Sequence, residues 1–119
     1  MPLPKFSDLI GKTLVAASHD KDTATFETED TRYSLYHSQD CCESVDLYDV
    51  NGDFEDLVGS PILFAEEVTS DNYKDSAYGD SYTWTFYRIG TVKGTVVMRW
   101  LGQSNGYYSE RVDFNETAI

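Results

Sequence analysis

The chain has 119 residues, of which 40% are apolar, and it carries a formal net charge of −12. This length suits one domain with one core, and no apolar run approaches the roughly 20 residues that a membrane-spanning helix needs. A strongly negative field repels nucleic acid and anionic membranes, so direct binding to either is not expected, whereas basic protein surfaces and metal cations are attracted.

The first predicted element is a short helical turn, and its sequence occurs twice. Residues 6–11 read FSDLIG, and residues 54–59, which lie 48 positions later, read FEDLVG. Ser7 and Asp53 are suited to cap these turns, and the glycine that closes each segment can adopt the left-handed conformation. Each turn is too short to be stable alone, so its apolar residues are expected to pack against a sheet.

The rest of the chain predicts β-strands separated by polar turns. Between residues 82 and 87 threonine and tyrosine alternate with aromatic residues at a period of two. Asn105-Gly106 indicates a hairpin, and either Gly90 or Lys93-Gly94 turns the hairpin before it. Residues 70–81 are polar and predict a loop. The strands are expected near 13–19, 23–28, 31–37, 44–50, 61–69, 81–90, 94–101 and 107–114.

These elements predict a mainly β fold at the border of the α+β class. Residues about 6–50 and 54–114 form two related halves of one domain, each with a short helical turn and about four antiparallel strands. So many short strands would leave unpaired edges unless the sheets close or pack face to face. A sandwich or a partly open barrel is therefore expected.

One short segment concentrates residue types that bind metals. Between positions 37 and 43 lie one histidine, two thiols and two carboxylates: His37, Asp40, Cys41, Cys42 and Glu43. These groups are candidate metal ligands, although adjacent cysteines are poorly spaced to reach one zinc ion. Two other interpretations stay open, a structural turn with one thiol in the core and a redox or nucleophilic use of a thiol. No cofactor is predicted, and both thiols are expected to be free.

The C-terminal half combines aromatic rings with arginines. Because the net charge opposes nucleic-acid binding, most of these rings are expected in the core, with guanidinium groups over ring faces. The residues are Tyr82, Trp84, Trp100, Tyr107 and Tyr108, with Arg88, Arg99 and Arg111.

Three segments together resemble a family of small uncharacterised proteins found mainly in bacteriophage genomes. They are residues 37–43, residues 56–63, and residues 84–87 with 104–109. The resemblance covers most of residues 6–114 and implies a phage origin, with the Asp-Cys-Cys-Glu box as a hallmark. It implies no activity and no catalytic residue.

The acidic charge suggests the function. Residues 40–80 hold twelve acids and one lysine, so a contiguous negative patch is expected there. The sequence therefore predicts a non-enzymatic, monomeric or homodimeric module that binds the basic surface of a host protein in the host cytoplasm, much as a DNA mimic would. A metal- or ligand-binding domain at residues 37–43 and a minor structural or assembly protein are the alternatives. The expected partner-binding residues are Asp46, Asp49, Asp53, Glu55, Asp56, Glu66 and Glu67.

Overall fold

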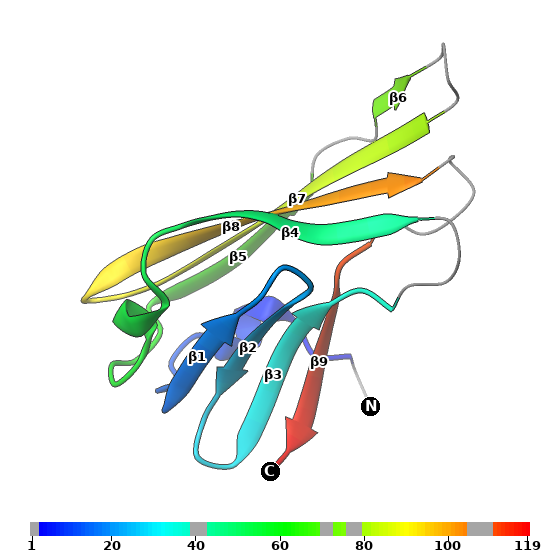
Figure 1. Ribbon diagram of the computed structural model, residues 1–119. Helices are drawn as coiled ribbons and strands as arrows, with labels where there is room; N and C mark the ends of the chain where they lie inside the picture. The colour runs from blue at the N-terminus through cyan, green and yellow to red at the C-terminus, as the bar shows by residue number, and fades with distance from the viewer. Residues whose placement is uncertain (1–2, 39–42, 70–72, 76–79, 105–110) are drawn as a thin grey trace.

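The computed structural model describes residues 3–38, 43–69, 73–75, 80–104 and 111–119 (Figure 1). The described residues contain two single-turn 3-10 helices, labelled η, and no α-helix, so the expected mainly β fold is confirmed. The elements follow in the order η1 (Phe6–Leu9), β1 (Ala16–His19), β2 (Thr23–Glu27), β3 (Thr31–Tyr36), β4 (Ser44–Asn51), η2 (Phe54–Leu57), β5 (Phe64–Thr69), β6 (Tyr73–Asp75), β7 (Asp80–Thr91), β8 (Gly94–Ser104) and β9 (Asp113–Ala118).

The strands form two antiparallel sheets that face each other as a sandwich (Figure 1). One sheet has the order β1-β2-β3-β9, and the other has the order β4-β8-β7-β5, with the short β6 also paired to β7. The last strand of each expected half crosses to the other sheet: β4 pairs with β8, and β9 pairs with β3. Each sheet is therefore built from strands of both halves of the chain.

The core lies between the two sheets and follows the alternation of the strands. In the four-stranded sheet Phe26 and Leu35 point inward, and in the five-stranded sheet Met98 and Trp100 do, all with no exposed surface. Phe6 closes the gap at η1, where its ring contacts those of Phe26, Tyr87 and Phe114 at centroid distances of 6.0, 4.9 and 5.7 Å. One ring thus joins β2, β7 and β9.

Both predicted helical turns form, and their apolar residues are buried as expected. Asp53 caps η2 by accepting the backbone N–H of Glu55 at 3.0 Å. The prediction that Ser7 caps η1 is wrong, because η1 begins at Phe6 and Ser7 lies inside it. There the carboxylate of Asp8 accepts the N–H of Lys5 at 2.9 Å instead.

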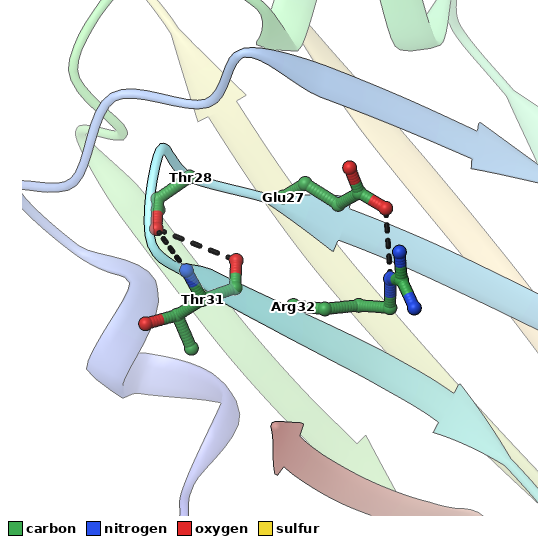
Figure 2. A network of polar contacts seen from close by, with 4 residues as sticks. All are labelled: Glu27, Thr28, Thr31 and Arg32. Carbon is green, nitrogen blue, oxygen red and sulfur yellow. Dashed lines mark hydrogen bonds and ion pairs between the residues drawn. The ribbon is translucent and has the colours of Figure 1, made fainter. Parts of the chain in front are cut away.

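The hairpin between β2 and β3 matches the predicted polar turn (Figure 2). The hydroxyl of Thr28 accepts the backbone N–H of Thr31 at 3.1 Å and lies 3.3 Å from its carbonyl oxygen. Beyond the turn, Arg32 donates to Glu27 at 2.8 Å across the two strands. This exposed ion pair contributes little to the stability of the fold, because solvent screens it.

Four sequence expectations about the later strands need correction or lie outside the described residues. The turn between β7 and β8 is made by Val92-Lys93, whereas Gly90 lies within β7 and Gly94 begins β8. Of the strand expected at 107–114, residues 107–110 lie outside the described residues, 111–112 are not in a strand, and β9 begins at Asp113, from where it pairs with β3 along residues 31–36. Residues 73–75, inside the expected loop, form β6. Asn105-Gly106 lies outside the described residues.

Candidate functional site

Each sheet has one face that no described element covers, and the two faces differ in chemistry (Figure 1). The four-stranded sheet turns outward mainly small and polar side chains such as Thr25, Ser34 and Asn115, which are neighbours across three strands. The five-stranded sheet presents instead a set that we call the outer aromatic face. It consists of Tyr48, Phe64, Val68, Trp84, Phe86, Arg88, Arg99 and Leu101.

The register of β7 places Trp84 and Phe86 on this face. Thr83 and Thr85 point into the sandwich and are only 7% and 4% exposed, whereas the neighbouring Trp84 and Phe86 point outward and are half-buried. Residues 83–86 alone would favour the opposite orientation, but Tyr87 and Ile89, which share the side of the threonines, are fully buried, and Arg88, which shares the side of Trp84, is exposed. The outward rings of Trp84 and Phe86 stack at a centroid distance of 6.5 Å. The register of β7 therefore determines which aromatic side chains form the outer aromatic face.

A bulge in β4 adds Tyr48 and Asp49 to the same face. Leu47 is paired with Trp100 and Asp49 with Arg99, so Tyr48 is the extra residue between them. The ring of Tyr48 meets Trp84 edge-on at 5.3 Å, and the Arg99 guanidinium lies 5.6 Å from the centroids of both rings. Arg99 also donates to Asp49 at 2.9 Å. This confirms the expected stacking of arginine on aromatic rings.

A second arginine, Arg88, contacts residues of β5 at the opposite edge of the face. Arg88 lies 4.9 Å from the centroid of Phe64 and 3.5 Å from the carboxylate of Glu66. The ring of Phe64 covers Gly90, where a Cβ atom would come within 2.5 Å of the ring. Gly90 therefore leaves room for the ring, which fills the place of the missing side chain.

The seven acidic residues predicted to bind a partner lie in three places. Asp46 and Asp49 are on β4, which is one edge of the five-stranded sheet, and Glu66 and Glu67 are on β5, which is the other edge. Three strand spacings, about 14 Å, separate these edges. The remaining residues, Asp53, Glu55 and Asp56, surround η2.

The expectation of one contiguous acidic patch is therefore not met by these residues. Asp49 and Glu66 are paired with Arg99 and Arg88, and Glu67 lies on the inward side of β5, opposite Tyr87. The structure brings the carboxylates of η2 together and places Asp46, Asp49 and Glu66 as a rim on either side of the outer aromatic face.

The segment predicted to bind metal is described only at its two ends. The His37 Nε2 and a carboxylate oxygen of Glu43 lie 3.4 Å apart, and the two side chains are only 4% and 1% exposed. The other ring nitrogen of His37, Nδ1, lies 2.6 Å from the carbonyl oxygen of Arg111. Asp40, Cys41 and Cys42 lie outside the described residues, so the expectation of free thiols remains a prediction.

A groove of about 960 Å³ runs between the edge strands β5 and β9 beside the N-terminal segment, and Glu67, Arg111 and Asp113 line it. Tyr87 lies behind it, with a buried hydroxyl that has no hydrogen-bond partner. Burial, and then the nearby charge of Glu67, raise the pKa of Tyr87 well above its ordinary value. The phenol of Tyr87 therefore stays neutral in the folded chain beyond the pH at which a free tyrosine ionises.

Sequence reasoning missed the outer aromatic face because it assigned the aromatic residues to the core. That holds for Trp100, which has no exposed surface, but not for Trp84. The alternation around Trp84 was visible in the sequence, but alternation alone does not say which side of a strand faces the core. No feature of the amino-acid sequence indicated the bulge at Tyr48.

A family model described as a domain of unknown function, DUF7448, matches residues 7–114. No curated protein and no solved structure matches the chain. Within the part of the chain that the structure describes, no helix has the length and apolar character needed to cross a bilayer.

Proposed function

The chain belongs to the DUF7448 family of domains of unknown function, and from this premise we propose that it is a non-enzymatic module that binds a protein partner through its outer aromatic face. The observation that carries the proposal is the register of β7, which buries Thr83 and Thr85 and turns Trp84 and Phe86 outward. Exposed aromatic clusters rimmed by polar residues are typical of protein interfaces.

The chemistry of the face fits an apolar patch on the partner that is surrounded by basic residues. Aromatic and arginine side chains supply most of the binding energy in many protein interfaces. The carboxylates of Asp46, Asp49 and Glu66 lie along both edges of this face, and the whole chain carries a net charge of −12. Lysines and arginines of a partner would be attracted to that rim.

The resemblance to phage proteins extends the proposal to a biological setting. In that setting the partner is a host protein with a basic surface, and the module acts in the host cytoplasm. Its contact with the host protein would compete with the anionic ligand, such as nucleic acid, that the basic surface normally binds. The support for this step is the charge of the chain together with the resemblance of residues 37–43, 56–63, and 84–87 with 104–109 to phage proteins.

Affinity capture from host lysate at low and high salt tests the proposal when face variants are compared. The double variant Tyr48→Ser/Phe86→Thr removes two outward rings, and Thr25→Ser/Arg32→Ser changes the uncovered face of the other sheet as a matched control. We expect the wild type and the control to retain the same basic protein at low salt and to release it at high salt. Equal retention by the Tyr48→Ser/Phe86→Thr variant, or no basic protein at all, would contradict the proposal.

A further inference from the structure

The buried pair His37 and Glu43 carries an inference that is independent of the outer aromatic face. Its starting point is the hydrogen bond between His37 Nδ1 and the carbonyl oxygen of Arg111, at 2.6 Å. A carbonyl oxygen only accepts, so Nδ1 must carry the proton. In the neutral ring, Nε2 then holds a lone pair.

That lone pair has no hydrogen-bond partner although it is buried. Among the described residues, the Glu43 carboxylate faces it at 3.4 Å, which is longer than the 2.7–2.9 Å of a charge-assisted hydrogen bond. A neutral Nε2 and a carboxylate oxygen are both electron-pair donors, so a proton or a metal cation between them makes their close approach in a buried site favourable.

We propose that His37 Nε2 and the Glu43 carboxylate bind one divalent transition-metal ion of the zinc type. Zinc bonds to histidine nitrogen and carboxylate oxygen are about 2.0–2.1 Å long, and two such ligands on a tetrahedral ion lie about 3.4 Å apart. The separation of Nε2 and the carboxylate oxygen is 3.4 Å. The two donors already have the spacing that the ion requires.

The contact at Nδ1 supports the same assignment. A histidine that binds a metal usually donates its other ring N–H to a carbonyl or carboxylate, which fixes both the tautomer and the orientation of the ring. The Arg111 carbonyl provides this contact from a position 74 residues away in the sequence. The pair joins the end of β3, the beginning of β4 and the segment before β9, so a bound ion would connect both sheets.

The described residues place these two ligands and bring together no group of three or more histidine, cysteine or acidic side chains. A tetrahedral ion held by two protein atoms keeps two further positions for other ligands. The inference therefore concerns the metal-binding role of His37 and Glu43.

Zinc titration of the full chain, stripped with chelator and followed by calorimetry, tests this assignment. His37→Asn keeps a side-chain N–H near the position of Nδ1 and removes Nε2, and Glu43→Gln removes the anionic ligand at nearly constant size. His19→Asn alters the chain's other histidine, which is exposed at the end of β1, and serves as the control. We expect one zinc per chain in the wild type and the control, and at least tenfold weaker binding in both site variants.

Thermal unfolding separates loss of the site from loss of the fold. Zinc is expected to raise the melting temperature of the wild type and of His19→Asn, because a ligand that binds only the native state stabilises it. It should leave the melting temperature of His37→Asn unchanged, even if that variant is less stable without zinc. A wild type that binds no zinc, or a folded His37→Asn variant that binds zinc as tightly as the wild type, would overturn the assignment.

Discussion

Gly11 and Gly59 make equivalent hydrogen bonds in the two matching segments of the chain. The N–H of Gly11 donates to the carbonyl of Ile62 at 2.8 Å, and the N–H of Gly59 donates to the carbonyl of Leu14 at 3.0 Å. Donors and acceptors are both related by the same offset of 48 positions. Each segment therefore donates one backbone hydrogen bond to the other. Both donor glycines have positive φ angles, 87° and 89°.

Glycine substitutions distinguish backbone strain from crowding. Gly11 and Gly52 both have positive φ, but a Cβ at Gly11 would meet nothing within 4 Å, whereas at Gly52 it would come within 2.4 Å of the Thr95 carbonyl oxygen. Gly11→Ala should cost about 1–2 kcal/mol of unfolding free energy, and Gly52→Ala should cost clearly more, about 2–5 kcal/mol. Urea denaturation measures both, and equal losses would show that crowding at Gly52 is unimportant.

The two helical turns are capped differently, which a pair of alanine variants can test. Asp53 accepts the Glu55 N–H, while Ser7 lies inside η1 and caps nothing. Asp53→Ala should lower the unfolding free energy by about 1 kcal/mol, and Ser7→Ala should change it by less than about 0.5 kcal/mol. The measurement is chemical denaturation of both variants beside the wild type. A larger loss in Ser7→Ala than in Asp53→Ala would contradict the observed caps.

The chain has two tryptophans, and fluorescence can report which side of the sheet each one faces. Trp100→Phe leaves the outward Trp84 as the emitter, and Trp84→Phe leaves the fully buried Trp100. Acrylamide should quench the first variant several-fold more strongly than the second, and its emission should lie at longer wavelength. The second variant should keep nearly wild-type stability. Similar quenching of the two variants would show that the outer aromatic face is covered in solution.

Tyr87 makes stability depend on alkaline pH. Because burial raises its pKa in the folded state, the folded chain holds the phenol proton more tightly than the unfolded chain. Its contribution is complete below pH about 10, where unfolded tyrosine is also protonated, and it declines as the pH rises above that value, by up to about 1.4 kcal/mol per pH unit.

Tyr87→Phe provides the comparison. The hydroxyl has no partner, so its removal should leave stability at neutral pH unchanged or slightly higher. Urea denaturation from pH 8.5 to 11 should then show a shallower decline for the variant than for the wild type. Parallel declines would mean that Tyr87 titrates normally in the folded state.

The sequence by itself determined the local structure. The matching segments at residues 6–11 and 54–59 predicted both helical turns, and their closing glycines do adopt positive φ. The alternation of β7 and the polar turn between β2 and β3 were also readable, since both depend on neighbouring residues. Within the segment predicted to bind metal, sequence proximity selected His37 and Glu43 as candidate ligands.

Only the tertiary structure decided which surfaces those elements present. Strand alternation gives two faces but does not choose the buried one. Strand β7 turns its threonines inward together with Tyr87 and Ile89, which lie on the same side of the strand and are fully buried, Tyr87 against the Phe6 ring. The pairing of β4 with β8 put Asp46 and Asp49 at the edge of the sheet opposite Glu66 and Glu67 on β5. Arg111 reaches His37 from 74 positions away, and pairings over such distances depend on the packing of the whole chain, which no local pattern records.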